Sequence, residues 1–311
     1  MPLIFYVTYF RFLYLRIELK NLKMRHLKLF TTVLLFALTF NSFQAQEKIK
    51  LENSVLWKVE HSELEKPSYI LGTLHLMCKE DFKISEKVSK ALQDSDALVL
   101  EVNFSDPKEV QSIQESMSNS KKISDELSEE QYRKLDKLVT EITEMPLDTY
   151  DAYGLSILNS ILLPNMLPCT EIKLFENELS LLANKNKKSI FALEKASQQI
   201  EVMKNAYPTE FALKQLMLFE SYKKDFNKAV IAYKNEDIVT AVELITKEDY
   251  MNENATKFMQ INRNQDWVQK MPEMMKERSN LFAVGAAHLT NDFGIIHLLR
   301  KKGYTVTAVT N

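Results

Sequence analysis

Two short stretches of the sequence, YILGTLHL at 69–76 and LFAVGAAHL at 281–289, carry residue types that can bind a metal ion or move a proton. Each is an apolar run that stops at a glycine and reaches a histidine three residues later, at His75 and at His288. The chain has 5 Gly and 5 His. Independent placement would give about 0.1 such G-x-x-H pairs, so the repeat predicts a shared role for the two histidines.

Two further apolar runs end at a carboxylate. ALVLE ends at Glu101, and SIFALE ends at Glu194. If the four runs are neighbouring strands of one sheet, two imidazoles and two carboxylates meet at its carboxyl edge, where open α/β sheets bind ligands. A glycine after a strand permits a tight turn or a close approach to the main chain.

Two histidines with one or two carboxylates suit Mn, Fe, Co or Zn and leave positions open for water. Such an ion lowers the pKa of water and polarises a carbonyl group, and a spare carboxylate can take the proton. The set therefore predicts hydrolysis of an amide or an ester. Simpler roles stay open, because a glutamate after a strand is often a helix cap and a histidine there is often a structural hydrogen-bond partner.

The stretch INRNQDW at 261–267 places Arg263, Asn264 and Trp267 in a helical pattern. One face of that helix could direct Arg263 at a carboxylate or carbonyl of a substrate. The alternative is a surface salt bridge.

The elements that must position these side chains follow from hydrophobic periodicity. The alternating run 55–60 and the run 69–73 predict a hairpin, and the short apolar runs above predict further strands. Helical spacing fills most of the sequence between them. The fold predicted is α/β, a central mixed sheet flanked by helices with large helical insertions between strands. The helical stretches expected are 84–92, 128–142, most of 155–254, and 292–303 capped by Asp292, with a last strand at 304–309.

Residues 1–45 form a separate segment. From Met24 the chain has a basic start, an apolar stretch at 29–40 and a polar end near Ala45, which is the layout of a secretory signal peptide. We expect cleavage after Ala45, a single domain over 46–311, and a secreted or periplasmic location. The alternatives are a membrane anchor if the segment stays uncut, and a longer leader if translation starts at Met1.

Charge and cysteine content limit the partners. Without residues 1–45 the chain keeps 34 basic and 41 acidic side chains, a net charge of −7. That sign disfavours nucleic acid. Cys78 and Cys169 either form a disulfide in an oxidising compartment or stay as two buried thiols.

The stretches GTLH, LVLEVN, ALEKASQQ, NRN and VGAAHL together resemble the TraB/GumN family, whose animal members include the Tiki metalloproteases. The resemblance spans about 51–311. It implies a fold akin to erythromycin esterase-like enzymes and haem-binding ChaN-like lipoproteins, with a divalent-metal site. By the motifs, His75 and His288 would be the motif histidines and Glu101 the motif carboxylate, with three further polar positions at Glu194, Arg263 and Asn264.

The function predicted is a metal-dependent hydrolase, peptidase-like, that acts on a peptide or a small molecule. The metal, Mn, Co or Zn, would be held by His75, His288 and Glu101. Glu194 would be a further ligand or the base. Arg263 and Asn264 would orient the substrate or the transition-state oxygen. Two alternatives are a module that binds haem or metal without turnover and a non-catalytic envelope protein whose polar groups hold loops.

Overall fold

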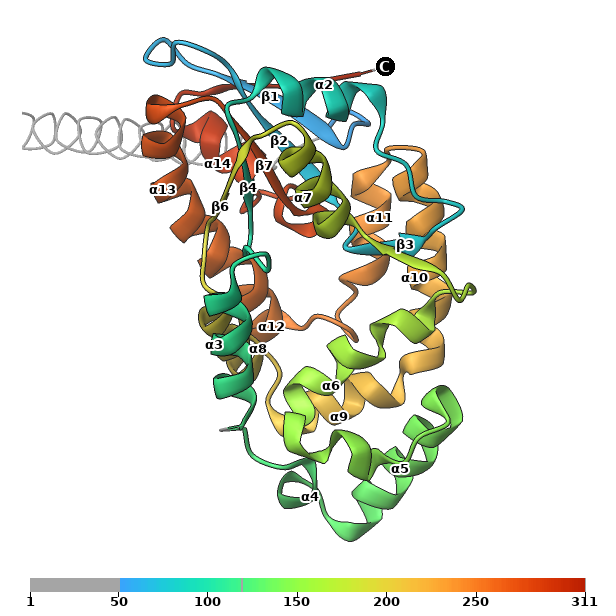
Figure 1. Cartoon of the computed structure of the whole chain (residues 1–311). Coiled ribbons are helices and arrows are strands. Elements are labelled where there is room, and N and C mark those ends of the chain that lie inside the picture. Colours follow the sequence, from blue (N-terminus) through green and yellow to red (C-terminus); the bar gives the residue numbers. More distant parts are fainter. Residues whose placement is uncertain (1–50, 119, 311) are drawn as a thin grey trace, which may run out of the picture. The chain divides into compact units, whose positions relative to one another are not determined.

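Six strands form one mixed sheet in the order β6-β4-β7-β2-β1-β8 (Figure 1). The four strands from β6 to β2 run parallel, and β1 pairs antiparallel with both β2 and β8. The α/β fold with a mixed sheet is thus confirmed. The strands are β1 Leu56–Glu60, β2 Ser68–Thr73, β4 Ala97–Leu100, β6 Ser189–Ala192, β7 Asn280–Gly285 and β8 Thr305–Ala308.

The structure, a computed structural model, describes residues 51–118 and 120–310. The chain divides into two units, residues 1–49 and residues 50–311, and the described residues belong to the second. The predicted leader and its cleavage after Ala45 lie outside the described residues. Within the described part, no helix has the length and apolar character needed to cross a membrane.

Burial explains which runs became central strands. Every residue of β4 and β7 is buried, as expected for parallel strands covered on both faces. In β1 the pattern alternates only in part, since Leu56, Trp57 and Val59 are buried and the other two residues are half-buried. Strand β6 lies at the sheet edge, where its residues are exposed or half-buried.

Helices fill the long connections between the parallel strands. Residues 101–188 separate β4 from β6, and residues 193–279 separate β6 from β7. The predicted helical insertions are therefore confirmed. Figure 1 shows α4, α5, α6 and α9 grouped away from the sheet. The helices are α2 Glu86–Asp94, α3 Pro107–Ser118, α4 Ile123–Glu126, α5 Glu129–Thr143, η2 Leu147–Tyr153, α6 Leu155–Leu162, η3 Leu163–Met166, α7 Phe175–Lys185, α8 Ala196–Ala206, α9 Thr209–Met217, α10 Phe219–Lys234, α11 Ile238–Ile245, α12 Glu253–Thr256, η4 Lys257–Ile261, α13 Asn262–Glu277, η5 Ala286–His288 and α14 Ile295–Lys301.

The last helix begins later than the sequence pattern predicts. Asp292 is not its cap, because α14 starts at Ile295 with Gly294 as N-cap. Residues before it form a tight turn in which the N–H of Gly294 donates to the Asn291 carbonyl at 3.2 Å. A Cβ on Gly294 would lie 2.2 Å from the Thr290 carbonyl oxygen, so this turn requires glycine.

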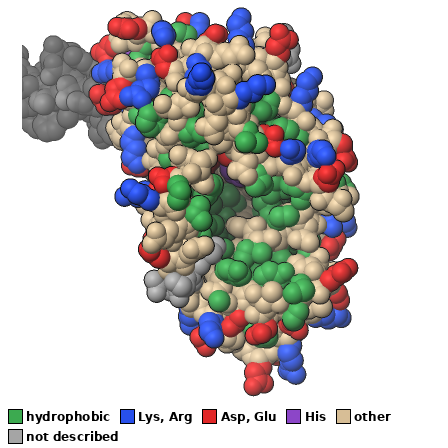
Figure 2. Space-filling model, viewed as in Figure 1, with side chains coloured by type: hydrophobic (Ala, Val, Ile, Leu, Met, Phe, Trp, Pro, Cys, Tyr) green, Lys and Arg blue, Asp and Glu red, His purple; other side chains and the backbone are tan. Residues whose placement is uncertain are grey.

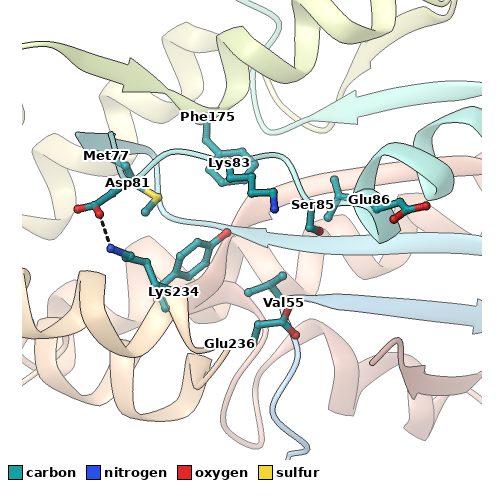
Figure 3. Close-up of a pocket in the computed structure, with 11 residues that line it drawn as sticks. Val55, Met77, Asp81, Lys83, Ser85, Glu86, Phe175, Lys234 and Glu236 are labelled. Carbon is teal, nitrogen blue, oxygen red and sulfur yellow. Dashed lines mark hydrogen bonds and ion pairs between the residues drawn. The ribbon is translucent and has the colours of Figure 1, made fainter. Parts of the chain in front are cut away.

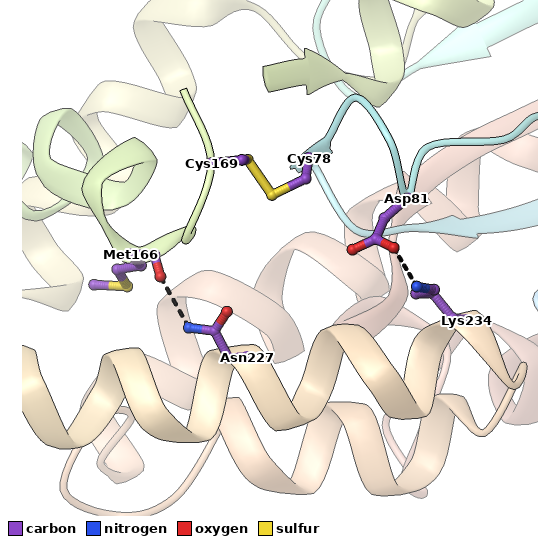
Figure 4. The surroundings of a disulfide bond; sticks show 6 residues. All are labelled: Cys78, Asp81, Met166, Cys169, Asn227 and Lys234. Carbon is purple, nitrogen blue, oxygen red and sulfur yellow. Dashed lines mark hydrogen bonds and ion pairs between the residues drawn. A yellow bond between two sulfur atoms is a disulfide. The ribbon is translucent and has the colours of Figure 1, made fainter. Parts of the chain in front are cut away.

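A second, two-stranded sheet pairs β3, Leu76–Cys78, with β5, Ile172–Leu174. Cys78 and Cys169 form a disulfide across it, so the open question between a disulfide and two thiols is settled for the disulfide (Figure 4). Helix α10 holds both sides of this link. Asn227 donates to the Met166 carbonyl at 2.9 Å, and Lys234 pairs with Asp81.

Candidate functional site

The four polar strand ends lie side by side, as the sequence predicts. Strands β6, β4, β7 and β2 are neighbours and parallel, so their carboxyl ends share one edge. The ladder continues past β4 and β6, where the N–H of Glu194 donates to the Glu101 carbonyl at 3.0 Å. Gly285 at the end of β7 is in register with Thr73 at the end of β2. The sheet itself therefore brings the two carboxylates and the two G-x-x-H turns together.

Arg263 joins this edge from helix α13 and is buried in it. Its Nη2 donates to Glu101 at 2.5 Å and to Glu194 at 2.7 Å, and its Nε donates to Glu194 at 3.2 Å. Its Nη1 donates to the Met259 carbonyl and to His288 Nε2, both at 3.0 Å. All five N–H groups of the guanidinium thus have acceptors within the protein. In this arrangement Arg263 positions the carboxylates and the histidine, and its predicted role toward substrate stays a prediction.

A π-helical turn supplies one of those acceptors. Residues Lys257–Ile261 form η4, a π-helix directly before α13. Single π-helical turns are frequent at functional sites because they release a carbonyl from the α-helical ladder. Here the Met259 carbonyl accepts from the Arg263 side chain four residues later.

Glu101 is ionised and held from several directions. The N–H of Gly285 donates to its Oε1 at 2.7 Å, and Gln199 Nε2 lies 3.3 Å from its Oε2. Burial alone would raise the pKa of this carboxyl, but the Arg263 guanidinium and the Gly285 N–H outweigh burial and hold its pKa well below the usual range. For Glu194 the balance differs, since burial raises its pKa and Arg263 offsets only part of that effect.

His288 is a buried, neutral imidazole of defined tautomer. Asn264 Nδ2 donates to the carbonyls of Phe293 at 2.8 Å and of His288 at 3.3 Å, so its Oδ1 is the atom that accepts from His288 Nδ1 at 2.6 Å. Nε2 therefore carries the lone pair. Burial and the Arg263 guanidinium lower the pKa of His288 to about 3. The Trp267 ring packs against the imidazole with centroids 4.5 Å apart.

His75 lies beside Gly285, near Glu101, and is held by a carboxylate that the sequence did not single out. Its Nδ1 is 2.9 Å from Oε1 of Glu176 in the first turn of α7, and Thr73 Oγ1 donates to the same oxygen at 2.7 Å. Desolvation favours the neutral ring, but the Glu176 carboxylate raises the pKa of His75 to about 9. Helix position alone could not have identified Glu176, because a glutamate in a first turn is common.

The packing around Gly72 and Gly285 explains why the G-x-x-H turn occurs twice. A Cβ on Gly285 would lie 3.1 Å from His75 Nε2 and 3.4 Å from Glu101 Oε1. A Cβ on Gly72 would lie 3.1 Å from Leu289 and 3.2 Å from the Ala286 main chain, just before His288. Each glycine thus leaves room for the turn that follows the other strand. The two G-x-x-H turns pack against each other across the β2 and β7 ends.

A metal ion is implied by the resemblance, and the donor set can be tested against it. Within 51–118 and 120–310, no group of three or more His, Cys, Asp or Glu side chains stands ready to hold one. His288 Nε2 lies 3.8 Å from Glu101 Oε1, with Arg263 beside both. The donor types nevertheless fit, because both histidines hold a partner at Nδ1 and have Nε2 on the side of Glu101, as metal-ligating histidines do. His288 Nε2 would exchange its hydrogen bond from Arg263 Nη1 for the ion.

The charges of the cluster agree with a divalent cation. The cluster contains three carboxylates: Glu101 and Glu194 pair with the Arg263 guanidinium, and Glu176 pairs with His75. With His75 protonated, as its raised pKa favours, the cluster carries one net negative charge; with both imidazoles neutral, as metal ligation requires, it carries two. A cluster of this kind is stable in a buried place only if a cation or protons balance it.

One of the two motif histidines is accessible from the surface. Figure 2 shows one face of the molecule hollowed near its middle, with hydrophobic side chains around the hollow and a histidine side chain visible in it. Among the described histidines, His75 is the exposed one, with 54% of its side chain accessible, whereas Glu101, Arg263 and His288 are buried. A ligand would therefore meet His75 first.

A pocket of about 530 Å³ lies next to β3 and the start of α7 (Figure 3). Met77, Phe175 and Tyr233 line it together with the loop that precedes α2. Two of its wall residues bond to the main chain of the first G-x-x-H motif: the Phe175 N–H donates to the His75 carbonyl, and Tyr233 Oη donates to the Gly72 carbonyl. None of the four charged groups of the carboxylate cluster lines this pocket.

The fold and the site define an α/β protein with a buried carboxylate, arginine and histidine cluster at the carboxyl edge of its parallel strands. The family model described as the TraB/PrgY/gumN family matches residues 55–308, which is most of the chain. The chain belongs to this family. No curated protein and no solved structure matched it.

Proposed function

We propose that the protein is a metal-dependent hydrolase of the TraB/GumN type that cleaves an amide or ester bond at the carboxyl edge of the sheet. The observation that carries the proposal is that His75 Nε2 and Glu101 Oε1 both lie beside Gly285, that His288 Nε2 lies 3.8 Å from Glu101 Oε1, and that Arg263 joins Glu101 to a second carboxylate, Glu194. Family membership and the net negative charge of the cluster support it.

In this proposal His75, His288 and Glu101 hold the ion. A divalent ion there supplies a Lewis acid that lowers the pKa of water and polarises a carbonyl group. Neutral imidazoles and an ionised carboxylate are the protonation states that ligation requires. The low pKa of Glu101 and the lowered pKa of His288, about 3, keep two of the three groups in those states.

Glu194 is the proton acceptor in this proposal. Its pKa is raised by burial, which makes a carboxylate a better base near neutral pH. Arg263 and Gln199 hold its two oxygens in place. Arg263 at the same time keeps Glu101 directed at the Gly285 turn, and Asn264 keeps His288 in the tautomer whose Nε2 carries the lone pair. Binding of the ion would replace the hydrogen bond that Arg263 Nη1 donates to this atom.

The substrate and the location are part of the same proposal. Hydrophobic side chains around the hollow favour a substrate with apolar groups, such as a peptide. The Cys78–Cys169 disulfide supports an oxidising compartment, consistent with export.

The first test is calorimetric titration of Mn²⁺, Co²⁺ and Zn²⁺ into the purified full chain, into the His75→Ala/His288→Ala variant and into His297→Ala as the control. His297 lies on α14 outside the cluster. We expect one ion per chain for the native protein and the control, and none for the double variant. A peptide library incubated with the loaded protein and read by mass spectrometry then tests cleavage.

Binding without any cleavage would contradict the hydrolase and favour the metal-binding alternative. A visible absorption band on adding haem, lost when His75 or His288 is replaced, would favour the haem alternative. Absence of metal binding in all three proteins would leave the two turns as structural devices.

A further inference from the structure

We propose that Glu176 is a positioning residue that orients the imidazole of His75 so that its Nε2 points at Gly285 and Glu101. The inference rests on the proposed function for its consequence, which is the affinity of the site for a divalent ion. The geometry that carries it is independent of any ion.

One oxygen of Glu176 is shared by two donors. His75 Nδ1 lies 2.9 Å from Oε1, and Thr73 Oγ1 donates to the same atom at 2.7 Å. Thr73 Oγ1 also lies 3.2 Å from the Val284 carbonyl of β7. This hydroxyl therefore connects the end of β2 to the strand that leads to the second histidine, and it fixes the oxygen to which His75 is bound.

A main-chain hydrogen bond also attaches His75 to helix α7. The Phe175 N–H donates to the His75 carbonyl at 2.9 Å, so the first two residues of α7 bind both the backbone and the side chain of His75. Leu76 and Leu174 are paired in the ladder between β3 and β5. These contacts fix the position of His75 relative to helix α7. The Cys78–Cys169 disulfide adds a covalent link next to the same small sheet.

The two histidines need different restraints because their surroundings differ. His288 is enclosed by protein and packed against Trp267, and an amide suffices to select its tautomer. The His75 side chain is 54% exposed, so packing does not fix its ring. A carboxylate at Nδ1 selects the ring orientation and makes Nε2 more basic, which is how outer carboxylates act on ligating histidines.

A matched control exists on the same helix. Glu178, two residues after Glu176, lies in the first turn of α7 and pairs with Lys173 at 2.7 Å instead of with a histidine. A change at Glu178 removes the same charge from the same helix end without touching His75.

The experiment uses the full chain and the variants Glu176→Ala, Glu176→Gln and Glu178→Ala, each checked for folding by thermal unfolding. Co²⁺ titration is followed by calorimetry and by the visible absorption spectrum. We expect Glu176→Ala to weaken Co²⁺ binding by about 10- to 100-fold and to change the spectrum. Glu176→Gln keeps an oxygen acceptor and should lose less, and Glu178→Ala should match the native protein.

A second readout needs no metal. In nitrogen-15 NMR spectra of the metal-free protein, the His75 Nδ1–H should be a downfield, slowly exchanging proton, because a carboxylate accepts it. The signal should persist in Glu178→Ala and be lost in Glu176→Ala. If it persists in Glu176→Ala, or if that variant binds Co²⁺ with native affinity and spectrum, the inference is wrong while the proposed function stands. If the native protein binds no Co²⁺, the proposed function fails, and the NMR signal alone decides whether Glu176 orients His75.

Discussion

At the scale of single residues, the site is a set of groups that restrain one another. Arg263 uses all its donors inside the protein, Asn264 uses its amide to select one tautomer of His288, and Glu101 receives a backbone N–H. Removing one residue from such a buried network costs more stability than removing one residue of an exposed ion pair. The polar groups that remain are then buried without hydrogen-bond partners. These groups are also closely packed, and Gly285 is the position at which an added side-chain atom would test that packing.

Replacing Gly285 with alanine should disturb the site through space and not through backbone strain, since its φ of −54° is open to any residue. The new Cβ would lie 3.1 Å from His75 Nε2 and must displace the ring. We expect the affinity for Co²⁺ to fall by about tenfold or more, with a loss of stability of about 1 kcal/mol from overpacking. Calorimetry and urea unfolding measure the two effects.

The cause can be separated in a double-mutant cycle. If the ring is the obstacle, Gly285→Ala should cost less stability in a His75→Ala background than in the native chain. Equal costs in the two backgrounds would mean that the Cβ disturbs Glu101 or the main chain, and the explanation by the His75 ring would be wrong.

At the scale of elements, the hydrophobic pattern predicts the long strands and helices but not the shortest strands. The hairpin of β1 and β2, the buried runs β4 and β7, and the helix α5 with its Ser128/Gln131 capping box are all where the hydrophobic pattern predicts them. The small sheet of β3 and β5 was not predicted, because three-residue strands carry no readable period. That sheet begins directly after His75, and the disulfide links Cys78 at the end of β3 to Cys169, just before β5.

Removing the disulfide with Cys78→Ala/Cys169→Ala should lower the free energy of unfolding by about 4 kcal/mol, because the link closes a loop of 91 residues in the unfolded chain. Urea unfolding measures the change. The native protein unfolded with a reductant serves as the control, and it should show the same midpoint as the variant. If neither the substitutions nor the reductant changes the midpoint, the disulfide does not contribute to the free energy of unfolding, and the prediction is wrong.

At the scale of the whole molecule, stability against acid depends on buried carboxylates outside the site as well as within it. Asp225 on α10 is 8% exposed and accepts from Lys247 Nζ at 2.6 Å and from Tyr250 Oη at 2.9 Å. The Lys247 bond lowers the pKa of Asp225 against a smaller effect of burial. These bonds attach α10 to the segment that follows α11.

Asp225→Asn should therefore destabilise the protein by about 2 kcal/mol at pH 7. Because the pKa of Asp225 is lower in the folded than in the unfolded chain, its contribution is complete above the unfolded value of 3.8 and disappears as the pH falls through the folded value. The difference between native and variant, measured by urea unfolding from pH 7 to pH 3, should narrow at the acid end. Asp249→Asn, at an exposed pair with Lys214, is the control and should change stability by less than about 0.5 kcal/mol. A constant difference across the pH range would contradict the assignment.

What the sequence determined by itself is local: which runs are buried strands, where each strand stops, and which polar residue stands at each stop. From those facts His75, Glu101, Glu194 and His288 could be assigned to one edge, because the side chains after parallel strands share the same end of a sheet. Metal binding and hydrolysis remain predictions at that level.

What only the tertiary structure decided is how those residues are held. Arg263 meets Glu101 across 162 positions of sequence, Glu176 meets His75 across 101, and Cys78 meets Cys169 across 91. No periodicity in the chain encodes such pairs, since each depends on how the helical connections return to the sheet. Local burial leaves a regular pattern in the sequence, whereas a contact between distant segments exists only once the whole chain has packed.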